Sequence, residues 1–260
     1  MKSKRASPGK AVSVSSSKAN HKVARTARGS KRPPAPLVLI DPGHGGHDPG
    51  AMASGLAEKN VTLSVARHLA KRLVKAGFRV KLTRSSDRAV TPLARLRMAS
   101  RLKPALFVSL HCNSAPSSRE RGLETFAYLP KRRHEGRGSV VPMEEVAVRS
   151  DSSVQAKSIH DRLTRAVRNR GVADNGVRLG RFAVLSPKPW PSILIEMGYL
   201  TNKYDAKRLA SKKFRAWFAG RLAYVLADHL KQRGTLLASA KDDAEERGGR
   251  RTSVKASPAS

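Results

Sequence analysis

The chain has 260 residues, 39% of them hydrophobic, which is enough for one sizeable domain with its own core or for two small ones. No run approaches the roughly 18 uninterrupted apolar residues of a membrane span, and the single cysteine, Cys112, excludes an internal disulfide and a multi-cysteine zinc site. The 52 Lys and Arg residues against 19 Asp and Glu give a formal net charge of +33, which predicts affinity for nucleic acid, anionic membranes or anionic wall polymers, with a plain solubilising excess as the alternative.

The two ends of the chain have the composition of disordered segments. Residues 1–36 contain ten Lys or Arg and no acidic residue, so they cannot bury enough apolar surface to offset their ordering entropy. Residues 234–260 are also polar and poor in aromatic side chains. We therefore expect a disordered basic arm, one folded domain over 37–233, and a disordered polar tail. The arm has the basic start of a secretory signal but not its apolar stretch of about 7–15 residues, so no signal peptide is recognisable.

Between these ends, apolar residues alternate between strand and helix patterns. The expected strands, in chain order, are 37–40, 78–82, 105–110, 122–129, 182–185 and 192–196. The expected helices, from a period near 3.6 residues, are 61–74, 93–102, 154–170 and 213–230. A Gly-rich, charged loop insertion at 130–152 interrupts the pattern. Strands that alternate with helices predict an α/β fold, with a twisted, mostly parallel central sheet of about six strands flanked by helices.

Chemically competent side chains follow several of these strands. The first strand runs into a Gly-rich turn with His44, the third ends at His111, and the last ends at Glu196. Glu58 precedes the first long helix, whose N-terminus we expect at the same edge of the sheet, where ligands of such folds bind. Two histidines and a carboxylate are suited to Zn²⁺ with a fourth position for water, and a nearby carboxylate can accept the water's proton.

Each of these residues also has a structural interpretation when it is taken alone. His44 and His111 could be a turn histidine and a hydrogen-bonded strand-end histidine, Glu58 could favour a helix N-terminus, and Glu196 could belong to a salt bridge. Glu196 is the hardest to dismiss, because a carboxylate after Ile-Leu-Ile is costly to bury without a partner. A Cys–His nucleophilic pair is disfavoured, since Cys112 and its neighbour His111 should point to opposite sides of an extended strand.

A series of landmarks runs through residues 37–231 in a consistent order. They are Leu39-Ile40-Asp41-Pro42-Gly43-His44-Gly45-Gly46, Gly55-Leu56-Ala57-Glu58-Lys59-Asn60, Phe107-Val108-Ser109-Leu110-His111-Cys112-Asn113-Ser114, Arg121-Gly122-Leu123-Glu124-Thr125 and Ile195-Glu196-Met197-Gly198-Tyr199-Leu200. Together they resemble the catalytic domain of the zinc-dependent N-acetylmuramoyl-L-alanine amidases, a family that includes bacterial cell-separation amidases and several phage endolysins. The stretch departs from the family's usual residues at Cys112, Ser100 and Asn175, none of which is a ligand position.

The resemblance implies a set of site residues and a reaction. It assigns one zinc ion to His44, Glu58 and His111 and the catalytic base to Glu196, in agreement with the cluster expected from the strand ends. The implied reaction is hydrolysis of the amide between the lactyl group of N-acetylmuramic acid and L-alanine in peptidoglycan. Asn113 is expected to line the site.

The resemblance also bears on regulation. Some members of this family block the zinc site with a regulatory segment near the position of the 130–152 insertion. Glu144 or Glu145 is therefore a candidate blocking carboxylate, although a plain surface loop is the favoured interpretation of the segment.

The expected partners follow from the charge and from the resemblance. Peptidoglycan is the expected substrate, the basic arm is expected to bind anionic envelope polymers, and an activator protein is compatible with the family. The periplasm or the cell wall is the implied location. The alternatives are a non-catalytic peptidoglycan-binding or amidase-regulating module on the same fold, and a basic nucleic-acid-binding protein. The full set of candidate ligands disfavours the first, and the lack of a nucleic-acid-binding signature disfavours the second.

Overall fold

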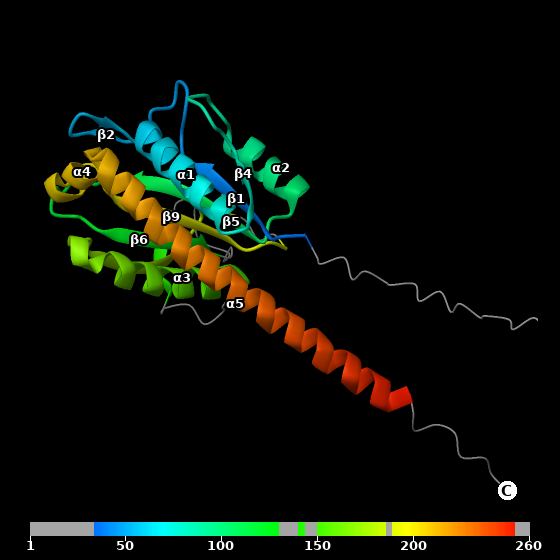
Figure 1. Cartoon of the computed structure of the whole chain (residues 1–260). Helices are drawn as coiled ribbons and strands as arrows, with labels where there is room; N and C mark the ends of the chain where they lie inside the picture. Colours follow the sequence, from blue (N-terminus) through cyan, green and yellow to red (C-terminus); the bar gives the residue numbers. More distant parts are fainter. Residues whose placement is uncertain (1–33, 130–139, 144–149, 186–188, 253–260) are drawn as a thin grey trace, which may run out of the picture. The chain divides into compact units, whose positions relative to one another are not determined.

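The computed structural model describes residues 34–129, 140–143, 150–185 and 189–252, with side chains described up to residue 235 except at 141 and 142. A seven-stranded sheet has the strand order β4-β1-β5-β9-β6-β8-β7 (Figure 1). Its strands are β1 (Leu37–Pro42), β4 (Arg79–Leu82), β5 (Leu106–Asn113), β6 (Leu123–Tyr128), β7 (Val140–Pro142), β8 (Asp174–Gly180) and β9 (Ser192–Tyr199). Two short strands, β2 (Met52–Ala53) and β3 (Leu56–Ala57), form a separate antiparallel hairpin.

The sheet is mostly parallel, as predicted. Strands β4, β1, β5 and β9 pair in parallel with one another, and β6 pairs in parallel with β8. The two antiparallel pairings join β6 to β9 and β7 to β8. Because β1, β5 and β9 run in the same direction, their carboxyl ends meet at one edge of the sheet.

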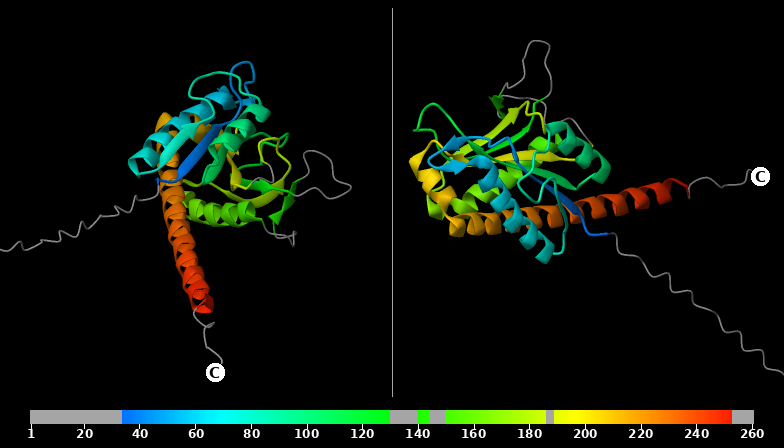
Figure 2. Two further views of the ribbon diagram at one scale, coloured as in Figure 1. Left: turned by 90° about the vertical axis from the view of Figure 1, so that its right-hand side faces the viewer. Right: turned by 90° about the horizontal axis from the view of Figure 1, so that it is seen from above.

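Helices cover both faces of this sheet (Figures 1 and 2). They are α1 (Glu58–Lys75), α2 (Pro92–Leu102), α3 (Asp151–Val167), α4 (Lys203–Ala210) and α5 (Lys212–Thr252). Along β1, Val38 and Ile40 pack into a core with α1, α3 and α5, whereas Leu39 packs on the other face with α2. The two-residue period of a strand thus divides the core into two layers. None of the described helices is both long enough and apolar enough to cross a membrane.

The predicted strand at 182–185 is wrong. Residues 174–180 form β8 instead, and a turn follows it. The apolar residues Val184, Leu185 and Trp190 are buried against the second core layer without joining the sheet, so their burial was mistaken for strand pairing. The sequence of β8 is polar and lacks the apolar pattern of a strand. It is a strand because its backbone pairs with β6 and β7 in the tertiary structure.

The helix α5 continues beyond its predicted end at residue 230, through 234–252, where the polar composition predicted a disordered tail. Eleven of the 19 residues from 234 to 252 are Ala, Leu, Lys, Arg or Glu, which favour a helix, whereas Gly234, Gly248 and Gly249 oppose it. Within the 130–152 insertion, β7 forms at 140–142 and α3 begins at Asp151. The candidate residues Glu144 and Glu145, the tail from 253, and residues 1–33 of the basic arm lie outside the described residues.

Candidate metal centre

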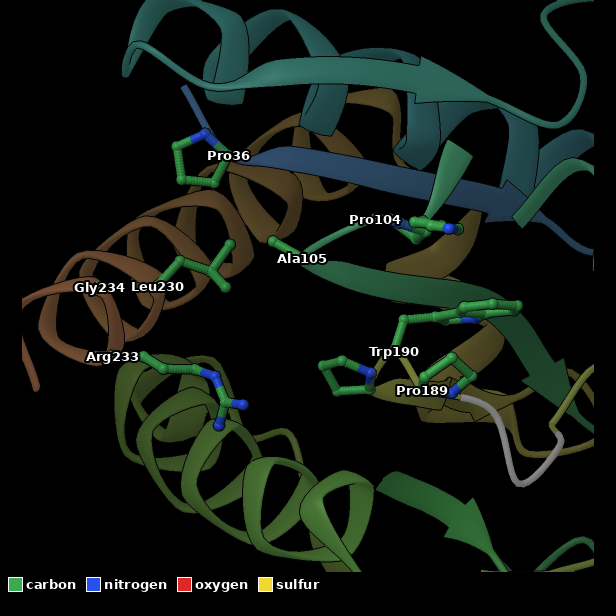
Figure 3. Close-up of a pocket in the computed structure, with 10 residues that line it drawn as sticks. Pro36, Pro104, Ala105, Pro189, Trp190, Leu230, Arg233 and Gly234 are labelled. Atoms are coloured by element: carbon green, nitrogen blue, oxygen red, sulfur yellow. The ribbon is translucent and has the colours of Figure 1, made fainter. Parts of the chain in front are cut away.

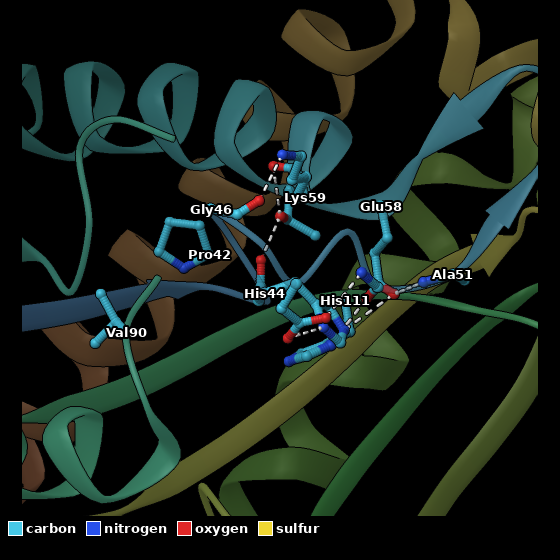
Figure 4. Close-up of polar contacts among 12 residues, drawn as sticks. Pro42, His44, Gly46, Ala51, Glu58, Lys59, Val90 and His111 are labelled. Carbon is cyan, nitrogen blue, oxygen red and sulfur yellow. Dashed lines mark hydrogen bonds and ion pairs between the residues drawn. The ribbon is translucent and has the colours of Figure 1, made fainter. Parts of the chain in front are cut away.

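The structure brings together the three predicted ligands from three separate elements (Figure 4). His44 follows β1, Glu58 is the first residue of α1, and His111 lies in β5. Their ligand atoms all lie within 4.8 Å of one another. Glu58 Oε2 is 3.1 Å from His44 Nε2, and Glu58 Oε1 is 2.9 Å from His111 Nδ1.

These residues fit a metal ion of the zinc type. Two imidazole nitrogens and one carboxylate form a nitrogen–oxygen donor set that leaves a fourth position open. His44 Nδ1 lies 2.8 Å from the Asp48 carboxylate, so His44 Nε2 is the ring nitrogen that faces Glu58 and could bind the metal. The sequence analysis assigned no role to Asp48. The signal was its position four residues after His44 in the same Gly-rich turn.

The electrostatics of the cluster favour a cation. Burial alone would raise the pKa of Glu58, but hydrogen bonds and charge from His111 and His44 outweigh it and hold this pKa well below its ordinary value. Burial lowers the pKa of His44, and the bonds to Glu58 and Asp48 together raise it above the usual range. The carboxylate is therefore ionised at neutral pH, in a buried position where it can bind a metal.

Two glycines make room for this convergence. A Cβ atom on Gly43 would lie 2.4 Å from the His111 ring. A Cβ atom on Gly50, whose φ is +67°, would lie 2.5 Å from Glu58 Oε2 and 2.6 Å from the His44 ring. Both positions therefore require a residue without a side chain, and Gly50 also adopts the left-handed conformation that glycine tolerates.

A buried ion pair between Arg95 and Asp41 holds the backbone of the turn that carries His44. Arg95 Nη1 lies 2.5 Å from Asp41 Oδ1, and both side chains are buried. Arg95 Nη2 donates to the carbonyl oxygen of His44 at 2.8 Å. Asp41 also accepts from the hydroxyl groups of Thr83 and Ser109. The two terminal nitrogens of Arg95 thus link the end of β1 to the backbone of His44, the first candidate ligand.

Further contacts hold the rest of the turn. Arg84, which is fully buried, donates to the carbonyl oxygen of Gly43 at 2.7 Å. Lys59 Nζ donates to the carbonyl oxygen of Gly46 at 2.7 Å (Figure 4). It also donates to Asp87 Oδ2 at 2.8 Å. The position of His44 is therefore set by side chains from α1, α2 and the segment between β4 and α2.

Glu196 lies directly beside the cluster. It is opposite His111 in the parallel register of β9 and β5. Its Oε2 atom is buried and has no hydrogen-bond partner among the described residues. Burial, together with the negative charges of Glu58 and Glu124, raises the pKa of Glu196 well above its ordinary value. A carboxyl group with a raised pKa is suited to proton exchange near neutral pH.

A cleft of about 480 Å³ opens next to Glu196. Asn113 lies in its wall and donates from Nδ2 to Glu124 Oε2 at 3.0 Å. The rest of the wall is mixed in character: Ser114, Ala115, Glu120, Glu124, Phe126, Val140, Arg178, Phe182 and Tyr199. The expected site-lining residue is therefore next to Glu196, in a space that can hold an extended ligand.

The backbone N–H of Cys112 donates to Glu58 Oε1 at 2.9 Å, but its thiol takes no part in this site. Its side chain is buried in the core shared with α1, α3 and α5. Burial raises the pKa of the Cys112 thiol well above its usual value. A thiol that stays protonated in an apolar core is a poor nucleophile, which agrees with the sequence argument against a cysteine mechanism.

A second cavity, of about 460 Å³, lies at the opposite edge of the sheet (Figure 3). Pro36, Ala105 and Pro191 in its wall directly precede β1, β5 and β9. Arg233, also in the wall, is paired with Asp151 through two contacts of 2.8 Å. The cavity therefore lies at the amino ends of the strands whose carboxyl ends carry the candidate ligands.

Comparisons with known proteins find a family match and similar solved structures. Residues 38–228 match the family described as N-acetylmuramoyl-L-alanine amidase. The endolysin of Bacillus phage SPP1 is 30% identical over 216 residues, which cover 82% of this chain and 73% of the endolysin. The solved structure of the amidase AmiC2 of Nostoc punctiforme is similar with a TM-score of 0.64 and 31% identity, covering 75% of this chain and 97% of that one. The CwlD amidase of Clostridioides difficile, solved in complex with the GerS lipoprotein, has a TM-score of 0.63 and 25% identity, covering 75% and 98%.

Proposed function

The chain belongs to the N-acetylmuramoyl-L-alanine amidase family, and from that premise we propose that one zinc ion, held by His44, Glu58 and His111, serves its hydrolysis of peptidoglycan. The observation that carries this proposal is the convergence of three donor side chains beside a buried carboxyl group whose Oε2 atom has no hydrogen-bond partner among the described residues. That carboxyl group, of Glu196, is the proposed base. A non-catalytic binding module has no evident use for either feature.

When bound, zinc supplies a Lewis acid that lowers the pKa of water toward about 7 and polarises the carbonyl group of the substrate. Glu196 accepts a proton from the attacking water and returns it to the leaving amine of L-alanine. The bond between the lactyl carbonyl carbon and the amide nitrogen breaks, which leaves a carboxylate on the glycan and a free amine on the peptide. Asp48 keeps His44 in the tautomer that faces the cluster.

The first experiment separates the roles of the residues. Glu196→Gln should keep its zinc in elemental analysis and lose about 10²–10⁴-fold in turnover, because it removes only the proton carrier. His111→Ala should lose both metal and activity. Asp161→Asn, on α3 outside the site, is the matched control and should match the wild type. Robust hydrolysis by Glu196→Gln would refute the general-base role.

The second experiment identifies the bond that is cut. Mass spectrometry of digested peptidoglycan should show free stem peptides together with peptide-free glycans, and a chelator should stop their release. Binding of isolated wall without any such products, with zinc present, would instead favour the non-catalytic alternative.

Three further proposals concern the setting of the enzyme. Its action lies outside the cytoplasm, in the periplasm or the cell wall, where peptidoglycan is found. The excess of basic residues at 1–36 supports binding to anionic envelope polymers, which deletion of residues 1–33 should weaken at low salt. The complex of CwlD with GerS supports the search for an activating partner, which added protein should reveal as a rise in turnover.

A further inference from the structure

The cleft beside Glu196 contains a charge pattern that the proposed chemistry does not use. Glu124 on β6 faces Glu196 on β9, and its side chain is 4% exposed. Arg178 on β8 lies with Nε 2.5 Å from Glu124 Oε1, and its side chain is 42% exposed. Of the described residues that line the cleft, Arg178 is the one cation.

The carboxylate of Glu124 is already occupied by donors of the protein. Besides Arg178, Asn113 Nδ2 lies 3.0 Å and the Tyr199 hydroxyl group 3.4 Å from its Oε2 atom. Arg178 is engaged through its Nε–H group, while a guanidinium carries five N–H donors in a planar fork. The terminal amino groups are therefore what this half-exposed side chain offers to the cleft. A carboxylate is the ligand that matches them in geometry and charge.

The spacing of the strands sets where such a carboxylate must be on the substrate. Glu196 on β9 pairs with Glu124 on β6, and Arg178 on β8 pairs with Phe126 on β6. Two strand spacings of about 4.8 Å each and a shift of two residues along the strands therefore separate the backbones of Arg178 and Glu196. An extended peptide covers roughly 10 Å in about three residues. The aromatic side chains of Phe126 and Phe182, whose rings pack edge to face at 4.7 Å, line the same cleft and can cover aliphatic parts of the peptide.

We propose that Arg178 is a specificity-determining residue that binds a free carboxylate of the stem peptide, on the second residue beyond the amide that is cut. This inference rests on the proposed function, because it takes the cleft beside Glu196 as the place where the stem peptide lies. Glu124 is the positioning residue that holds the guanidinium in the cleft wall.

The test uses two synthetic muramoyl peptides that differ only in the residue after L-alanine, which carries either a free carboxylate or its amide. The wild type should hydrolyse the free acid with a kcat/KM at least about tenfold higher, as expected for one charge-assisted hydrogen-bonded pair. Arg178→Met should reduce this preference to within about threefold, mostly by slowing hydrolysis of the acid. Arg178→Lys should keep part of it, because it retains the charge without the fork. Arg165→Met, exposed on α3, is the matched control and should keep the wild-type ratio.

Arg178→Met leaves the buried Glu124 without its cation and can lower stability for that reason alone. The double variant Glu124→Gln, Arg178→Met removes both charges, and it should also lose the preference for the acid. A wild-type ratio near one, or a full preference in both variants, would overturn the assignment.

A binding measurement separates this inference from the proposed reaction. The affinities of both peptides for Glu196→Gln can be measured by calorimetry without turnover. Tighter binding of the acid than of the amide, lost on adding Arg178→Met, supports the assignment even if the wild type hydrolyses neither peptide. Equal binding of acid and amide by Glu196→Gln counts against it even if the wild type is an active amidase.

Discussion

The replacement of Arg95 by Met is a direct test of the buried ion pair beneath the His44 turn. Arg95 and Asp41 are 4% and 0% exposed, and their charged atoms are 2.5 Å apart. Removing one partner of such a pair leaves the other charge buried, which typically costs about 3–5 kcal/mol. Two hydroxyl donors remain on Asp41, so we expect the lower end of this range, about 3 kcal/mol. A domain of this size is stable by only about 5–15 kcal/mol, so the loss should be easy to measure.

The assay is urea unfolding of the wild type, Arg95→Met, Asp41→Asn and the double variant, all without metal. We expect the double variant to cost less than the sum of the two single changes by about 2 kcal/mol, since the second change no longer leaves a buried charge alone. Arg97→Met, an exposed position on the same helix, is the matched control and should stay within about 0.5 kcal/mol of the wild type. Strict additivity in the cycle, or a loss for Arg95→Met no larger than that of Arg97→Met, would refute the reasoning.

Three further predictions rest on local geometry. Gly50→Ala should lower zinc affinity by at least tenfold in competition with a chelator, because its Cβ would press on the His44 ring; unchanged affinity would contradict the close packing. Cys112 should react with a thiol reagent only at the rate of unfolding, and rapid labelling of the native protein would contradict its burial. Burial raises the pKa of Asp174, but hydrogen bonds from His160 and the Gly176 backbone lower it by more, so this pKa lies below its ordinary value. The unfolded chain then binds the extra proton, and stability falls as the pH drops below about 4; Asp174→Asn should flatten this fall, and an unchanged pH profile of urea unfolding would count against it.

Much of the fold could be predicted because its signals are local. The strands β1, β5 and β9 are short apolar runs, and α1, α2 and α3 show a helical period, so burial and secondary structure agree along the chain. The strand β8 and the helix α4 were not predicted from the sequence, for different reasons. The strand is polar and depends on its neighbours for backbone partners, whereas α4 has eight residues and too short a pattern to recognise.

The candidate site divides in the same way. The candidate ligands His44, Glu58 and His111 and the carboxylate of Glu196 could be named from the sequence, because strand ends and the order of the landmarks mark them. Asp48 and Arg178 could not, since a hydrogen bond to an imidazole and a place in a cleft wall leave no local pattern.

By itself the sequence determined the α/β class, the strands whose carboxyl ends carry the site, and the residue types gathered there, because each depends on composition and short-range periodicity. Only the tertiary structure decided which atoms meet. It places Glu58 between two histidines and the buried Arg95 against the turn that carries His44. It also places the half-exposed Arg178 in the wall of the cleft. Those contacts join residues that are tens of positions apart, and their energy depends on burial and distance, which no segment of the chain specifies alone.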